Sequence, residues 1–93
     1  MEESLRRDGP IQRLFRICTQ DTELGGVTIR KDEWVALFFA SANRDPAVFE
    51  NPDEFILNRP NIKHHMTFGH GIHFCMGNAV ARMEAEKLMN GIL

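Results

Sequence analysis

The chain has 93 residues, of which 43% are hydrophobic and 26% are charged, values that are normal for a soluble globular protein of single-domain size. Its net charge of −2 and its scattered basic residues give no electrostatic support for binding to nucleic acid or to an anionic membrane. The longest apolar run, residues 34–40, is far shorter than the roughly 20 residues of a membrane-spanning helix, and no signal peptide opens the chain. We therefore expect a soluble, cytoplasmic protein with no nucleic-acid and no membrane partner.

Residues 1–7 are rich in helix formers, and Asp-Gly-Pro at residues 8–10 ends this pattern. A helix of two turns is marginal in isolation, so we expect the chain to begin inside a longer helix. Glu3 and Arg6 stand three residues apart and share one face of the predicted helix. Their spacing alone indicates only a solvated ion pair worth under about 1 kcal/mol.

Two segments that follow have the character of β-strands. Residues 13–19 alternate in polarity, and residues 27–30 are rich in β-branched side chains. The turn residues 24–26 lie between them, so we expect the two strands to pair as a hairpin. Cys18 lies in the first strand, with neither glycines nor a helix start behind it, and we interpret it as a packing residue. A disulfide with Cys75 is not expected, because nothing in the sequence indicates secretion.

The middle of the chain combines a strongly apolar segment with an irregular one. Residues 34–39 form a continuous apolar run, which is typical of a strand buried on both faces. A short helix or turn is predicted at residues 41–46, with Ser41 as its candidate cap. Residues 49–59 contain no sustained period and indicate an ordered meander.

The four histidines all lie in the last third of the chain, at positions 64, 65, 70 and 73. His64 and His65 are neighbours in a polar loop, so their side chains point in different directions and we expect both to be solvated. A closed zinc site needs four ligands and usually paired cysteines, and only Cys75 lies near these histidines. Zinc is therefore disfavoured.

The most informative stretch is residues 68–77, which read Phe-Gly-His-Gly-Ile-His-Phe-Cys-Met-Gly. Its three glycines allow left-handed or sharply turned backbone and a close approach to a flat ligand. They are Gly69, Gly71 and Gly77. This loop therefore has the composition of a ligand-binding loop.

A helical pattern begins directly after the cysteine of this loop. The apolar spacing from Met76 onward predicts a helix that carries Arg82 and the other charged side chains outward. Cys75 would then lie at a helix N-terminus, where unpaired N–H groups and the macrodipole favour the thiolate, the form that binds metal. The alternative is an inert buried thiol, since free cysteine is among the most buried residue types.

This loop resembles the cysteine-ligand loop of the cytochrome P450 haem-thiolate monooxygenases, whose pattern is Phe-Gly-x-Gly-x-x-x-Cys-x-Gly. The matching residues are Phe68, Gly69, Gly71, Cys75 and Gly77. Fixed residues at half of the ten positions make the signal specific. The resemblance covers the whole chain in order, with a Glu-x-x-Arg pair at residues 3–6, Asn-Arg-Asp-Pro at residues 43–46 and Phe-x-x-x-Arg at residues 55–59.

The resemblance implies a role for each of these residues. Cys75 would be the catalytic, axial iron ligand of haem b (iron protoporphyrin IX), and its thiolate would push electron density toward O–O cleavage. Arg16 and His73 would meet the haem propionates, which are costly to bury without a cation or a strong donor. Phe68 would pack near the thiolate, and the loop glycines would let the backbone lie against the macrocycle. A buried cluster of one carboxylate and two guanidiniums would brace the fold: Glu3, Arg6 and Arg59.

The implied fold class is an α+β fragment of the mainly α cytochrome P450 fold. It comprises a short β region, an irregular meander, the cysteine-ligand loop and a following helix. The family's domain is much longer, so we expect residues 1–93 to be an incomplete domain, the C-terminal segment of a single cytochrome P450 domain.

The resemblance also implies an activity and its partners. The parent enzyme would be a bacterial-type soluble monooxygenase that inserts one oxygen atom from O2 into a small organic substrate, with electrons from a ferredoxin or a similar redox partner. The chain alone is expected to be inactive, because the family's oxygen-activating helix and substrate pocket precede the matched part. A second hypothesis is a non-catalytic remnant or folding segment that binds little or no haem.

Overall fold

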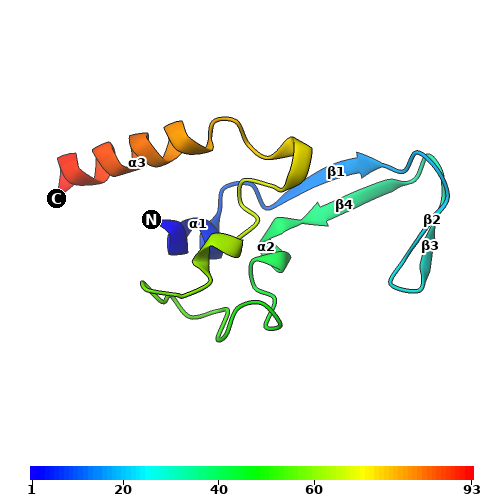
Figure 1. Ribbon diagram of the computed structural model, residues 1–93, viewed down its shortest axis with the longest axis horizontal. Coiled ribbons are helices and arrows are strands. Elements are labelled where there is room, and N and C mark those ends of the chain that lie inside the picture. The colour runs from blue at the N-terminus through cyan, green and yellow to red at the C-terminus, as the bar shows by residue number, and fades with distance from the viewer.

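A computed structural model describes residues 1–93 as one elongated body with extents of 51 × 28 × 17 Å. Figure 1 shows α3 along one edge, α1 near the centre beside it, and the strands extending away from both helices. The elements in chain order are α1 (Glu2–Asp8), β1 (Arg13–Ile17), β2 (Thr22–Leu24), β3 (Val27–Ile29), β4 (Trp34–Phe38), α2 (Phe39–Ala42), the 3-10 turns η1 (Ile62–His64) and η2 (Gly71–His73), and α3 (Asn78–Ile92).

The strands form two separate antiparallel pairs, and the predicted hairpin is wrong in its pairing. β1 pairs with β4, so that Ile17 lies opposite Trp34, whereas β2 pairs with β3. Gly25 and Gly26 have φ angles of 57° and 78°, the conformation that a two-residue hairpin turn requires. This tight turn joins β2 to β3 directly, and the strand predicted at residues 13–19 pairs instead with β4, which follows this hairpin in the chain.

The apolar sequence of β4 predicted a strand buried on both faces, and this prediction is wrong. Trp34 is 71% exposed and Phe38 is 52% exposed. Within residues 1–93 only β1 pairs with β4, and Figure 1 shows no second layer over most of this ribbon. The predicted cap at Ser41 is also wrong, because α2 begins at Phe39 and has no side-chain capping hydrogen bond.

The buried interior is mainly polar. Only two apolar side chains, Phe39 and Phe49, are buried. The buried polar and charged residues are Glu3, Arg6, Asn43, Arg59, His65 and Thr67. Because buried charges are costly unless they are paired and hydrogen-bonded, these residues must satisfy one another.

Glu3 lies between two guanidiniums, which is the arrangement of the buried cluster considered above. Arg6 donates from Nε and Nη2 to the two carboxylate oxygens of Glu3, each at 2.8 Å. Arg59 donates from Nε to Oε1 at 3.2 Å, and the backbone N–H of Ile56 donates to the same oxygen at 3.1 Å. These donors, the Arg6 side chain first among them, lower the pKa of Glu3 from 4.5 to about 2.

The remaining N–H groups of the two arginines donate to backbone carbonyls of the irregular meander and of Asn43. Arg6 Nη1 donates to the carbonyls of Asn43 and Pro52 at 2.7 and 2.8 Å. Arg59 donates to the carbonyls of Glu50, Asn51 and Glu54. Both guanidiniums also cover the ring of Phe49, at 5.3 and 5.9 Å from its centroid. This ion cluster therefore joins α1 to a segment that has no regular hydrogen bonding of its own.

A second polar contact joins the middle of α1 to Thr67, the residue before the cysteine loop. Thr67 donates its hydroxyl to the carbonyl of Leu5 at 2.6 Å and accepts a hydrogen bond from Asn43 Nδ2 at 3.1 Å. A Cβ added at Gly9 would lie 2.6 Å from the Leu5 carbonyl and 3.0 Å from Thr67. The residue before the loop that carries Cys75 is therefore packed directly against α1 and its C-cap, Gly9.

No helix in this structure combines the length and the apolar character that crossing a membrane requires.

We expect Arg59→Ala to lower the free energy of unfolding by about 3–5 kcal/mol, because it leaves a buried carboxylate with one guanidinium instead of two. The matched control is Asp53→Ala, since Asp53 also binds an arginine, Arg44, at 2.8 Å, but with side chains 79% and 39% exposed. This exposed pair should contribute less than about 1 kcal/mol. Urea titration followed by circular dichroism measures both values, and equal losses in the two variants would contradict a buried cluster.

Acid should remove the contribution of Glu3. Its folded-state pKa of about 2 lies below the ordinary 4.5, so the stabilisation is complete above pH 5 and is lost as the pH falls toward 2. A shift of this size corresponds to about 3 kcal/mol. We expect Glu3→Gln to be less stable than the wild type at pH 7 and to lose less stability between pH 5 and pH 2.5. The exposed Glu84→Gln serves as the control, and parallel acid profiles for wild type and Glu3→Gln would contradict the cluster.

Candidate functional site

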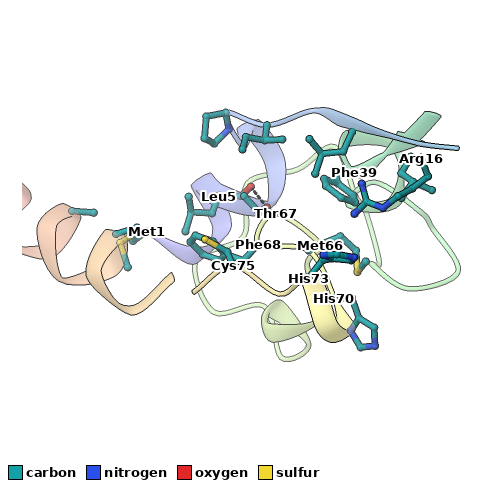
Figure 2. A pocket seen from close by; sticks show the side chains of 17 residues that line it. Met1, Leu5, Arg16, Phe39, Met66, Thr67, Phe68, His70, His73 and Cys75 are labelled. Atoms are coloured by element: carbon teal, nitrogen blue, oxygen red, sulfur yellow. Dashed lines mark hydrogen bonds between the residues drawn. The ribbon is translucent and has the colours of Figure 1, made fainter. Parts of the chain in front are cut away.

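The site is a cavity of about 370 Å³ that lies between α1, β1, the cysteine loop and α3. Eleven of its 17 lining residues are hydrophobic. Figure 2 shows side chains from these elements converging on the cavity, with Cys75 and Phe68 drawn close together and Arg16 and His73 further along. The cavity thus combines an apolar wall with one thiol and a small number of cationic or titratable side chains.

The loop before Cys75 is folded back on itself. Gly69 and Gly71 have φ angles of 76° and 67°, in the left-handed region that favours glycine. The η2 turn follows, and the backbone N–H of Cys75 donates to the carbonyl of Phe68 at 2.9 Å. Phe68 and Cys75 are therefore held at the two ends of one closed loop, and both line the cavity.

Gly77 differs from the other two glycines. Its φ of −79° is open to any residue, so Gly77 lies in a turn without the left-handed conformation that Gly69 and Gly71 adopt. A Cβ added there would lie 3.8 Å from the sulfur of Cys75, an ordinary contact distance. Gly77 therefore leaves space beside the sulfur, at a turn whose backbone angles do not themselves require glycine.

Cys75 lies just before α3 and not within its first turn. The helix begins at Asn78, two residues later than the apolar spacing predicted, and Gly77 is its N-cap. The backbone N–H and the side-chain Nδ2 of Asn78 both donate to the carbonyl of Cys75, at 3.3 and 2.7 Å. The thiol of Cys75 is exposed and faces the cavity. The alternative prediction of an inert, buried thiol is therefore wrong.

The two predicted propionate-binding residues line the same cavity as Cys75. Arg16, on β1, uses one N–H to bind the carbonyl of Phe15 at 2.9 Å and forms no salt bridge. His73 closes the η2 turn two residues before Cys75. Both side chains therefore keep donors that face the cavity.

Cys18 and the ion cluster lie outside the cavity lining. The sulfur of Cys18 lies 2.8 Å from the carbonyl of Gln20, near the far end of β1. The cluster residues Glu3, Arg6 and Arg59 bind the meander instead, the two arginines through carbonyls such as those of Pro52 and Asn51. They have a structural position and do not contact the cavity.

His65 is buried, which corrects the prediction that it is solvated. Its Nε2 lies 3.0 Å from the carboxylate of Glu2, and its Nδ1 accepts the N–H of Thr67 at 3.3 Å. His64 is exposed at the end of η1, as predicted. The partner of His65 lies 63 residues away in the sequence, so no local pattern could have identified it.

The helical pattern predicted that Arg82 points outward, and this prediction is wrong. Arg82 donates from Nε and Nη2 to the two oxygens of Glu2, at 2.8 and 3.1 Å. These bonds, together with the weaker contribution of His65, lower the pKa of Glu2 to about 2, and the pKa of Arg82 is raised in return. No local sequence pattern connects Glu2 with Arg82, because they lie 80 positions apart.

Comparison with known proteins identifies the family. The Cytochrome P450 family matches residues 1–93. The chain is 46% identical over 94 residues to the biotin biosynthesis cytochrome P450 of Bacillus subtilis, covering 100% of this chain and 23% of the relative. It is 47% identical over 93 residues to cytochrome P450 109 of Bacillus spizizenii, again covering 100% of this chain and 23% of the relative.

Solved structures agree with this assignment. P450BioI, in a complex with an acyl carrier protein ligated to hexadec-9Z-enoic acid, superposes with a TM-score of 0.93 at 46% identity, over 99% of this chain and 24% of that one. CYP109E1 from Bacillus megaterium, in complex with testosterone, superposes with a TM-score of 0.92 at 43% identity, over 97% of this chain and 25% of that one. The chain therefore belongs to the cytochrome P450 family.

The chain spans between a fifth and a quarter of the length of the relatives that it matches. Members of this family bind haem b and are monooxygenases, and haem b is accordingly the cofactor of the family to which this chain belongs.

Proposed function

We propose that this chain is the haem-binding, proximal segment of a bacterial-type cytochrome P450 monooxygenase and that Cys75 provides the axial thiolate. The observation that supports this most directly is the exposed thiol of Cys75 in an apolar cavity that also contains Arg16 and His73. Only Cys75 among the cysteines faces this cavity. The function therefore depends on one sulfur atom in one loop.

The residues that line the cavity fit haem b in their chemistry. The apolar walls suit a flat, hydrophobic macrocycle, and a thiolate is an established iron ligand for haem. Haem also has two carboxylates, which need cations or strong donors if they are to leave water. Arg16 and His73 supply such groups, and we assign them to the propionates.

Each residue of the segment then has a defined task. Cys75 donates charge to the iron, and Phe68, whose carbonyl accepts the N–H of Cys75, shields the sulfur from water. Gly69 and Gly71 turn the loop through left-handed backbone angles, and Gly77 keeps the space beside the sulfur open. When bound, haem supplies the oxygen chemistry by which one atom of O2 enters an organic substrate.

We also propose that residues 1–93 are the C-terminal segment of one longer domain. Few apolar side chains are covered within this chain, and large ones are exposed on β1, β4 and α3. They include Phe15, Ile17, Trp34, Phe38, Val80, Met83, Leu88 and Ile92. Surfaces of this extent are normally covered by further protein, so the remainder of the domain would pack over the strands and the helix.

The partners of the whole enzyme follow from the family. We propose a small organic substrate, bound on the face of the haem that this segment does not form, and a ferredoxin or similar redox protein as electron donor. The family relatives include proteins in complex with a steroid and with an acyl carrier protein, so the family does not specify the substrate.

The alternative is a non-catalytic segment that does not retain haem. The same exposed apolar faces favour this second candidate for the isolated chain, because half of the binding site would be open to water. Titration of the 93-residue chain with haem, followed by absorbance, separates the two: saturable binding with a thiolate spectrum supports the first, and its absence supports the second.

We expect Cys75→Ala to abolish the long-wavelength thiolate absorption of the reduced carbon monoxide complex, while Cys18→Ala keeps it. The comparison uses the complete domain, meaning a full-length haem-loaded cytochrome P450 that carries residues 1–93 as its matched segment. Cys18→Ala is the matched control, because it removes the same atoms outside the cavity. If Cys75→Ala retained the band, the iron ligand would have to be another residue.

A further inference from the structure

Arg82 occupies a position that the proposed haem chemistry does not yet use. Its guanidinium lies 4.5 Å from the centroid of the Phe68 ring, within the range of a favourable cation–π contact. Its Nη1 also donates to Oδ1 of Asn78 at 2.8 Å. One side chain of α3 therefore contacts both the residue that begins the cysteine loop and a residue that follows it.

Phe68 and Asn78 are each hydrogen-bonded to the backbone of Cys75. Asn78 donates from Nδ2 to the carbonyl of Cys75 at 2.7 Å, and the N–H of Cys75 donates to the carbonyl of Phe68 at 2.9 Å. Arg82 is therefore connected to the backbone of Cys75 by two series of contacts. One passes through Phe68 and the other through Asn78. Figure 2 shows Phe68 and Cys75 close together.

The guanidinium itself is held in place from the opposite end of the chain. Glu2 on α1 accepts two hydrogen bonds from Arg82, in the parallel arrangement that suits a planar guanidinium. The same carboxylate is bound by the buried His65, whose ring lies 6.0 Å from that of Phe68. The side chain of Arg82 is 33% exposed, so its position is determined by these partners and not by burial alone.

We propose that Arg82, held by Glu2, is a positioning residue that sets the place of the Phe68 ring and of the Cys75 sulfur relative to the iron. This inference rests on the proposed function, since it concerns the same cysteine. Arg82 does not contact the cavity, so it acts only through Phe68 and Asn78. A guanidinium is required because no other side chain can form the paired bonds to Glu2, cover an aromatic face and donate to Asn78 together.

The test compares Arg82→Lys and Arg82→Gln in the complete domain, with Lys87→Gln as the control. Lys87 lies on the same helix, is exposed, and its side chain forms no hydrogen bond or salt bridge. Three properties are measured: the reduction potential of the iron, the thiolate absorption of the reduced carbon monoxide complex, and the affinity for haem. Arg82→Lys keeps the positive charge but loses the planar guanidinium with its paired N–H donors. It therefore distinguishes an effect of side-chain geometry from an effect of charge.

We expect both Arg82 variants to shift the reduction potential, to lose thiolate absorption and to bind haem roughly 10-fold or more weakly, as when an outer partner of a metal ligand is removed. Lys87→Gln should match the wild type. Glu2→Gln keeps the guanidinium of Arg82 but weakens its hydrogen bonds to residue 2. It should therefore change the same three properties less than the Arg82 variants do. If Arg82→Gln does not fold, Arg82→Lys and Glu2→Gln still decide the question.

Two negative results are distinguishable. A wild-type domain without thiolate absorption would contradict the proposed function itself. A wild-type domain with that absorption, and with Arg82→Lys matching it in potential, spectrum and haem affinity, would overturn the positioning role alone, even if Arg82→Gln were unstable.

Discussion

One carboxylate buried between two guanidiniums holds α1, the meander and, through them, the cysteine loop in place. Glu3 is 2% exposed and would be unstable as an isolated charge, so it requires the hydrogen bonds of Arg6 and Arg59. The same arginines then bind carbonyl groups of a meander that has no helix or strand to satisfy them. An interior with only two buried apolar side chains is thereby held together by polar contacts with defined geometry.

This polar framework also positions the cysteine loop. Arg6 binds the carbonyl of Asn43, and Asn43 binds Thr67, which in turn donates to the carbonyl of Leu5 on α1. Phe68 follows Thr67 directly, so the start of the loop is fixed relative to α1. On the other side, Glu2 binds Arg82 of α3, so both ends of the loop are tied to one short helix.

Local sequence patterns predicted the local features of the fold. The Gly25-Gly26 turn, the glycine-rich loop and the helix behind Cys75 depend on residues close in the chain, and each has a recognisable composition. The pairing of β1 with β4 could not be read in the same way, because nothing in residues 13–19 identifies which later strand lies beside them. The predicted hairpin failed for this reason.

The same limit applies to the side chains around the site. Cys75, Arg16 and His73 were identified through a family pattern, and they line one cavity. Glu2, His65 and Arg82 belong to no local motif, and periodicity assigned Arg82 to the solvent face. Their contacts join residues 63 and 80 positions apart, so only the folded chain brings them together.

We propose that the sulfur of Cys75 binds the iron, and X-ray absorption at the iron edge of the haem-loaded domain can detect this bond. Measured on the haem-loaded complete domain, the spectrum should contain one sulfur neighbour of the iron in addition to the nitrogen neighbours of the macrocycle. This sulfur signal should be absent from Cys75→Ser. An iron surrounded only by nitrogen and oxygen, or a sulfur signal that persists in Cys75→Ser, would contradict the account.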